Sequence, residues 1–179
     1  MRKINTILSA VILAIFLVHG VMGSFLLLGV GTNAATILAW IGFGLILVHA
    51  GLGVVLTVQA VREGGKSGRW YLRQNAEFWT RRFSGAAIMI LLFFHFGTYG
   101  ETVNGTFGLK EFTTVKLITQ LLLIAALFIH IFVNIRPLLI SLGVIKQKER
   151  RVDLFLTGSV FLLFFTGAVL IYYIGWQYL

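Results

Sequence analysis

Residues 36–61 read TILAWIGFGLILVHAGLGVVLTVQAV, a run of apolar residues without one charged side chain. A helix that crosses the hydrocarbon of a bilayer needs about 20 mostly apolar residues. The run does not alternate apolar and polar positions as a barrel strand does, so it predicts a membrane-spanning helix. Its single ionisable side chain is His49, near the middle of the run.

Four other runs of the chain have the same character. Of the 179 residues, 58% are apolar and only 12% are charged, whereas soluble domains carry roughly 25% charged residues. We therefore expect an all-α integral membrane bundle of five transmembrane helices, forming one domain over residues 1–179. The expected spans are Ile4–Leu28, Thr36–Val61, Phe83–Tyr99, Phe112–Ile135 and Leu154–Tyr173.

The connections between these runs hold most of the polar residues. Residues 29–33 are short and uncharged, residues 62–82 are rich in Gly, Lys and Arg, and residues 100–111 are rich in Gly, Thr and Asn. The fourth connection is expected to begin at Arg136-Pro137, because proline stops or kinks a helix. It ends in the charged run Lys146–Arg151.

The basic residues gather on one side of this topology. With the N-terminus inside, all but two of the 15 Lys and Arg residues lie on the inner side, and only Lys110 and Lys116 lie on the outer side. The positive-inside rule then predicts a cytoplasmic N-terminus and an outer C-terminus, in the inner (cytoplasmic) membrane of the cell. This asymmetry explains the net charge of +9 without nucleic acid. The first run is too long for the core of a cleaved signal peptide.

The chain has four histidines, and each lies inside one of the first four expected spans: His19, His49, His95 and His130. An ionisable group in hydrocarbon is costly and indicates a functional site. At about 1.5 Å per residue, His19 and His95 lie about 20 Å from the cytoplasmic ends of their spans, and His49 and His130 about 10–16 Å. The sequence therefore predicts an outer pair, His19 with His95, and an inner pair, His49 with His130.

Two imidazoles at one depth on facing helices are the ligands of a bis-histidine haem iron, because the porphyrin supplies the other four nitrogens. A zinc or copper site needs three or four protein ligands close together. The chain has no cysteine, which excludes thiolate-held clusters and covalent haem attachment. We therefore expect two haems b, with no open coordination position and hence a role in electron transfer.

Other residues are candidates for contacts with these haems. Small residues let a macrocycle or a neighbouring helix approach the backbone, and they lie near the histidines at Gly20, Gly23, Gly51, Gly53 and Gly85. Haem propionates are anionic and need basic or polar partners. The candidates at the inner level are Asn5, Thr6, Trp79, Arg81, Arg82 and Arg136.

The segment Phe78-Trp79-Thr80-Arg81-Arg82-Phe83-Ser84-Gly85, followed ten residues later by His95, resembles a known family. It is similar to the cytochrome b membrane anchor of succinate dehydrogenases and fumarate reductases, in the five-helix, two-haem form. His49 with its glycines, and His130 followed by Arg136, resemble the second and fourth spans of that family. In the family the haem ligands pair first span with third and second with fourth.

The resemblance implies a reaction and a set of partners. A flavoprotein subunit would interconvert succinate and fumarate, and an iron–sulfur subunit would dock on the cytoplasmic face. The haems would pass electrons to or from a membrane quinone, often menaquinone. The dicarboxylate chemistry would lie on the partner subunits, so this chain would be a quinone-reactive, electron-transferring subunit.

The chain departs from the family in its short length and in the lack of acidic residues in its first two spans. A proton path through an intramembrane glutamate is therefore not expected. Polar residues near the outer haem level provide the candidates for a quinone site, with Glu101 as the proton acceptor. These candidates are Glu101, Tyr99 and Asn33.

Two other classes of protein remain open. Other di-haem membrane cytochromes, such as hydrogenase, nitrate reductase or b561-like subunits, mostly place two histidines on one helix, and this chain places one on each of four. A structural or transport subunit with hydrogen-bonded histidines would bind no haem and would show no Soret band.

Overall fold

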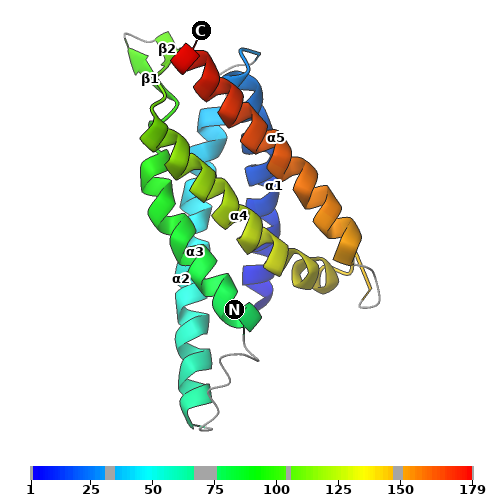
Figure 1. Ribbon diagram of the computed structural model, residues 1–179. Coiled ribbons are helices and arrows are strands. Elements are labelled where there is room, and N and C mark those ends of the chain that lie inside the picture. Colours follow the sequence, from blue (N-terminus) through cyan, green and yellow to red (C-terminus); the bar gives the residue numbers. More distant parts are fainter. Residues whose placement is uncertain (1, 31–34, 67–75, 104–105, 147–150, 179) are drawn as a thin grey trace.

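The computed structural model of the chain describes residues 2–30, 35–66, 76–103, 106–146 and 151–178. Within them it contains α-helices and one β-hairpin (Figure 1). The helices are α1 (Arg2–Leu27), α2 (Ala35–Lys66), α3 (Ala76–His95), α4 (Thr114–Ser141) and α5 (Arg151–Tyr178). The strands of the hairpin are β1 (Gly100–Val103) and β2 (Thr106–Leu109).

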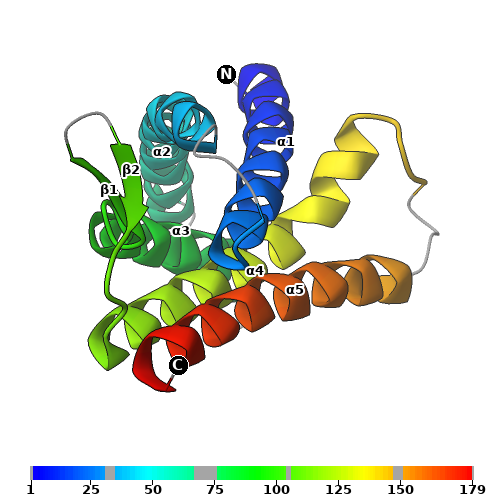
Figure 2. The same ribbon diagram turned by 90° about the horizontal axis from the view of Figure 1, so that it is seen from above.

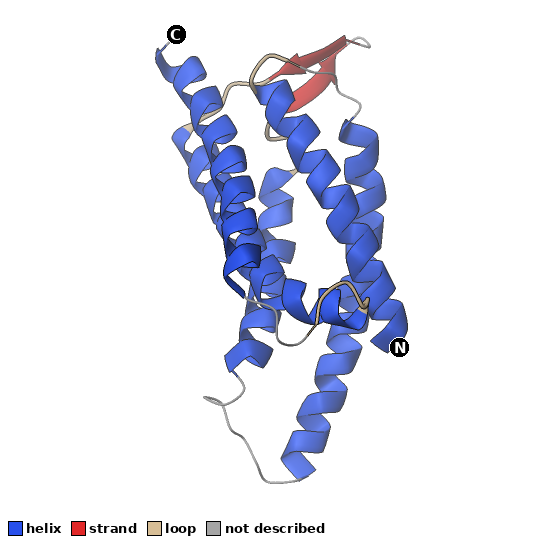
Figure 3. Cartoon of the chain, turned by 90° about the vertical axis from the view of Figure 1, so that its right-hand side faces the viewer, coloured by secondary structure: helices blue, strands red, loops and turns tan. Residues whose placement is uncertain are grey.

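The helices run alternately in opposite directions between two ends of the bundle (Figures 1 and 3). We call the end that holds Arg2 the N-end, and the end that holds the hairpin and Tyr178 the C-end. Among the described residues, α1 packs along α2, α3 packs along α4, and α5 contacts both α4 and α1. Figure 2, a view from above, shows α4 and α5 side by side beneath α1.

The surfaces of these helices are apolar. α1, α2, α4 and α5 are each long and apolar enough to cross a membrane, which makes the chain a multi-pass membrane protein. Large apolar side chains lie exposed along the bundle, for example Phe93 at 73% and Leu163 at 71%. α3 is shorter and carries Glu77, Arg81 and Arg82 near its start.

The most closely packed part of the described bundle lies at the C-end. Phe112, Val169 and Tyr172 form a buried cluster there, with Tyr99 and Leu117 packed against it. The hydroxyl of Tyr172 on α5 donates to the carbonyl oxygen of Lys110 at 2.7 Å.

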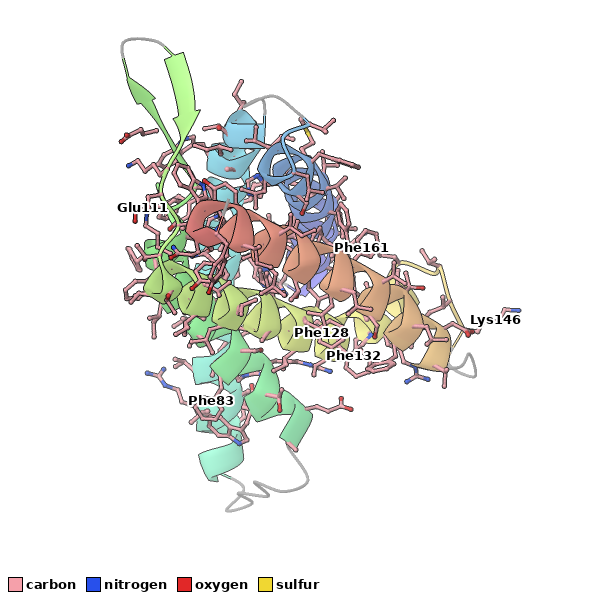
Figure 4. The ribbon with its side chains drawn as sticks, turned by 45° about the horizontal axis from the view of Figure 1, so that its top comes forward. Phe83, Glu111, Phe128, Phe132, Lys146 and Phe161 are labelled. Carbon is pink, nitrogen blue, oxygen red and sulfur yellow. The ribbon has the colours of Figure 1, made fainter. Side chains whose placement is uncertain are left out.

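A second aromatic group joins α4 to α5 nearer the N-end. Phe128 and Phe132 lie on the part of α4 that faces α5 (Figure 4), and both rings contact Phe155. These two aromatic groups hold α5 against the bundle. The four histidines lie on the other helices, α1 to α4.

Pro137 lies inside α4, which continues to Ser141. The prediction that the fourth connection begins at Arg136-Pro137 is therefore wrong, and the last turns of α4 instead bend away from its axis (Figure 2). A proline has no N–H to donate to the carbonyl four residues earlier, here Val133. Arg81 Nη2 on α3 donates to the Val133 oxygen at 3.3 Å. The acceptor that the proline leaves unpaired thus has a donor from the neighbouring helix, and α4 can continue.

α3 differs from the predicted third span at both ends. It begins at Ala76, before Phe83, and ends at His95, before Tyr99. The end has a local cause, since Gly97 adopts φ +63°, a left-handed conformation that terminates helices and suits glycine. The amide of Thr98 then bonds to the carbonyl oxygen of His95 at 3.2 Å.

The predicted loop over residues 100–111 contains the hairpin. Its strands are antiparallel and pair Gly100 with Leu109 and Glu101 with Gly108. The chain then enters α4 through Thr113, whose hydroxyl oxygen accepts from the amide of Lys116, as an N-cap residue does. Phe112, directly before this cap, is fully buried and anchors the start of α4.

Candidate functional site: two histidine pairs inside the bundle

His19 and His95 lie opposite each other toward the C-end. His19 is on α1, and His95 is the last residue of α3. Their ring centroids are 6.2 Å apart, and the ring planes are inclined by 77°. We call these two residues the C-end pair.

His49 and His130 form a similar arrangement nearer the N-end of the bundle. His49 lies on α2 and His130 on α4. Their ring centroids are 6.5 Å apart and their planes are inclined by 87°. We call them the N-end pair. The structure thus brings together the histidines that the depth argument grouped, while their role as iron ligands stays a prediction.

The two helices of each pair are not close neighbours. α1 packs on α2 and α3 packs on α4, whereas contacts between α1 and α3, or between α2 and α4, are few at most in the described chain. The two rings of each pair therefore meet although their helices are not packed against each other.

The distance between the rings fits a metal ion between them. With a metal–imidazole bond of about 2.0 Å and a ring radius of about 1.2 Å, two imidazoles on opposite sides of one ion have centroids about 6.4 Å apart. The observed separations of 6.2 and 6.5 Å agree with this value. In the described residues no three His, Cys, Asp or Glu side chains gather. Each pair would offer two imidazoles, the number of ligands that a haem iron requires from protein.

Gln120 on α4 hydrogen-bonds one nitrogen of the C-end pair. Its Oε1 lies 2.8 Å from Nδ1 of His95. Gln120 is buried, with 1% of its surface exposed. An amide oxygen can only accept, so Nδ1 of His95 carries the hydrogen and Nε2 is the nitrogen with a free lone pair in the neutral ring.

Ser84 on α3 plays the corresponding part in the N-end pair. Its Oγ lies 3.0 Å from Nδ1 of His130 and 2.6 Å from the carbonyl oxygen of Thr80. The single hydroxyl hydrogen goes to the Thr80 carbonyl, which can only accept, so Oγ accepts from Nδ1–H of His130. His130 therefore also keeps its lone pair on Nε2. Nδ1 of His49 is buried and has no hydrogen-bond partner among the described residues.

One of the predicted glycines, Gly85, lies against a histidine ring. A Cβ on Gly85 would lie 3.4 Å from Cε1 of His130, so the bare backbone of α3 lies against that ring. Gly23 and Gly53 follow His19 and His49 by four residues, on the same helix faces. Apart from the backbone of their own helices and their chain neighbours, no described atom lies within 4 Å of where their Cβ atoms would be, so both glycines face open space.

Arg81 and Arg82, two predicted propionate ligands, lie on the first turns of α3. Arg81 pairs with Glu77 at 3.2 Å, and Arg82 lies over the Phe78 ring at 3.2 Å. Nε of each is buried without a hydrogen-bond partner in the described chain. Both therefore have a donor left for an anionic group.

The other predicted propionate ligands are placed as follows. The ring of Trp79 stacks on Phe83 at 5.7 Å. Asn5 and Thr6 lie in the first turns of α1, and Oδ1 of Asn5 is buried without a partner among the described residues. Arg136 directly precedes Pro137 in α4.

Two of the predicted quinone-site residues, Tyr99 and Glu101, lie in the described chain. Tyr99 lies between His95 and the C-end cluster, with ring centroids 5.7 Å from His95 and 5.2 Å from Phe112. Burial, and to a lesser extent Tyr172, raises the pKa of Tyr99, so its hydroxyl stays protonated at neutral pH. Glu101 lies on β1, is half exposed and pairs with Lys110 at 2.8 Å. Asn33 lies outside the described residues.

Gln120 and Ser84 were missed as site residues by the sequence reasoning. Ser84 belongs to the segment that carries the family resemblance, and Gln120 is one of two amides within the fourth apolar run, ten residues before His130. A polar side chain in such a run indicates a function by the same argument as a histidine does. Comparison of the chain with family models, with curated proteins and with solved structures finds no match.

Proposed function

We propose that the C-end pair and the N-end pair are the axial ligands of two b-type haems, and that the protein is a transmembrane electron carrier. The observation that carries the proposal is the spacing of the two ring pairs, 6.2 and 6.5 Å, which fits bis-imidazole ligation. Two further features support it. His95 and His130 keep a lone pair on Nε2 because Gln120 and Ser84 accept from Nδ1, and the Nε atoms of Arg81 and Arg82 would offer donors to propionates.

When bound, two such haems would transfer single electrons between the two faces of the membrane. The residues of this chain would set the distance over which they do so. Gln120, which contacts His95, and His130 are ten residues apart on α4, which is about 15 Å along the helix. With both axial positions filled by histidine, the protein would favour electron transfer over binding of oxygen.

We further propose that the chain is the membrane anchor of a succinate:quinone oxidoreductase, either a succinate dehydrogenase or a fumarate reductase. This rests on the resemblance of residues 78–85 and His95 to that family, and on one histidine in each of four helices. α3 would be the fifth span. At about 1.5 Å per residue it is about 30 Å long, with Arg81 and Arg82 near the membrane face. The basic N-end would be cytoplasmic and would bind the iron–sulfur subunit, which in turn would bind the flavoprotein subunit.

A second candidate is a membrane subunit whose histidines only join helices. The bonds from His95 to Gln120 and from His130 to Ser84 favour it, because polar side chains commonly connect helices within membranes. It predicts no haem, whereas the first candidate predicts two.

A pyridine haemochrome assay on the purified full-length chain, with a reduced-minus-oxidised spectrum, decides between these candidates. We expect two haems b per chain and a Soret band. Fewer than two haems would contradict the proposal, and none would favour the structural alternative. Co-purification with a subunit that holds covalent flavin tests the succinate or fumarate function separately. A two-haem chain that purifies with hydrogenase or nitrate reductase subunits would assign it to another cytochrome class.

A further inference from the structure

Gln120 is the described polar side chain with the least exposure, and the proposed function does not by itself explain its position. We propose that Gln120 is a positioning residue that holds His95 in the Nδ1–H tautomer, so that His95 presents the lone pair of Nε2 for ligation together with His19. This inference rests on the proposed haem function for its purpose, but the tautomer that it assigns is a property of the chain alone.

The orientation of the Gln120 amide follows from its other contacts. Its Nε2 donates to the carbonyl oxygen of Phe94 at 3.2 Å and to Oγ1 of Thr119 at 3.4 Å. A carbonyl can only accept, so the nitrogen of the amide must face Phe94 and the oxygen must face His95. The reversed amide would place its oxygen against the Phe94 oxygen, two acceptors with no hydrogen between them.

The Phe94 carbonyl is available because of the way α3 ends. Gly97, at φ +63°, turns the chain out of the helix after His95. The amide of Thr98 consequently bonds to the oxygen of His95 and not to that of Phe94. The Phe94 oxygen accepts instead from the hydroxyl of Thr98 and from Gln120. The way α3 ends thus orients the side-chain amide of Gln120. That amide in turn determines which nitrogen of His95, the last residue of α3, carries the hydrogen.

Hydrogen bonds to the second ring nitrogen are the usual means by which proteins orient metal-binding histidines. The contact at 2.8 Å places such a bond between α4 and α3, two helices that pack together. A purely structural bond between these helices would stabilise the bundle equally, so a loss of stability in a Gln120 variant would not test the proposal. The test therefore needs a measurement on the ring of His95.

The first measurement is ¹⁵N-histidine NMR on the dithionite-reduced full-length chain in lipid nanodiscs, with signals assigned by single histidine substitutions. Low-spin ferrous haem is diamagnetic, so the signals are observable with or without haem. We expect a downfield, hydrogen-bonded Nδ1 proton for His95. Gln120→Leu should move this signal upfield. Gln120→Glu, which keeps an acceptor oxygen, should keep it downfield.

The second measurement is haem affinity and a redox titration of the same variants. We expect Gln120→Leu to weaken binding at the C-end pair about 10- to 100-fold and to raise the midpoint potential of that haem, because an imidazole without its acceptor donates less charge to ferric iron. Gln120→Glu should restore the potential to the wild-type value or below it. Opposite effects of Leu and Glu would not arise from a loss of packing.

Thr119→Ala is the matched control. It removes a contact of the Gln120 nitrogen and leaves Phe94 to hold the amide, so we expect the His95 signal to stay unchanged. If Gln120→Leu leaves the His95 signal and both midpoint potentials unchanged in a chain with two haems, the assignment of Gln120 is overturned and the proposed function stands. If the chain binds no haem but Gln120→Leu still moves the His95 signal, the assignment stands and the haem function is wrong.

Discussion

Gln120 and Ser84 hydrogen-bond the Nδ1 atoms of His95 and His130, and both reach the ring from a neighbouring helix. Each histidine would otherwise bury a polar nitrogen in an apolar bundle, which carries a cost of the order of a few kcal/mol. The bond leaves one nitrogen of each ring for a second partner. At the scale of the residue, the account therefore depends on which nitrogen carries the hydrogen.

Ser84→Ala tests this point in the N-end pair. It removes the oxygen that accepts from His130, so we expect about 10-fold weaker haem binding at that pair and no change at the C-end pair. Haem content during titration with hemin, followed by absorbance, measures the effect. Ser159→Ala is the control, because the Ser159 hydroxyl is exposed and donates only to its own helix at Phe155. Equal losses at both pairs would count against a specific role of Ser84.

Pro137 shows how one element depends on another. The proline leaves the Val133 oxygen in α4 without its usual donor, and Arg81 of α3 supplies one at 3.3 Å. Val133 is three residues beyond His130, so this contact joins α3 to α4 just beyond the N-end pair. The kink of α4 and the position of Arg81 are therefore parts of one arrangement.

A double-mutant cycle measures that coupling. Arg81→Met should lower the free energy of unfolding by about 1–3 kcal/mol, the usual cost of leaving a buried acceptor unpaired. In the Pro137→Ala background the alanine N–H can bond to Val133, so the same substitution should cost less. Denaturation in mixed detergent micelles, followed by circular dichroism, gives the four free energies. Costs of Arg81→Met that are equal in both backgrounds would show that Arg81 and Pro137 are independent.

At the scale of the whole molecule, the two ends of the bundle differ in their number of basic side chains. The end reached by Lys146 is rich in Lys and Arg, and the end that holds Glu111 has few of them. Both residues are exposed and labelled in Figure 4, at the two ends of the segment that contains α4. The positive-inside rule predicts that the Lys146 end lies in the cytoplasm.

The absence of cysteine makes this orientation directly testable, since any introduced cysteine is the only one in the chain. We expect Glu111→Cys to react with a membrane-impermeant maleimide in intact cells. Lys146→Cys should react only after the cells are opened, and a mass shift on denaturing gels records both. Labelling of Lys146→Cys in intact cells would show that the orientation is the opposite one, with the proposed docking face for soluble subunits outside.

The helices and the histidine grouping were predictable from the sequence because both depend on the length of apolar runs and on residue spacing along a helix. Long apolar runs require helices in a bilayer, and rise per residue converts position into depth. Helix ends at His95 and Ser141 were not predictable in this way. The first depends on the φ of Gly97. The second lies beyond Pro137, and the continuation of α4 past that proline depends on a donor from another helix, Arg81.

The partners of the rings were equally hidden from the sequence. Gln120 reaches His95 because α3 and α4 lie side by side, and no spacing within one helix indicates that contact. The fifth span, the haems and the partner subunits stay predictions, supported by ring geometry and by resemblance.

Haem content of four single variants tests the central claim most directly. His19→Ala, His49→Ala, His95→Ala and His130→Ala should each retain one haem, measured by pyridine haemochrome assay and by the midpoint potential of the haem that remains. We predict that the variants of His19 and His95 keep the same haem, and that those of His49 and His130 keep the other. Crossed losses, or two haems retained in any of the four, would contradict the account.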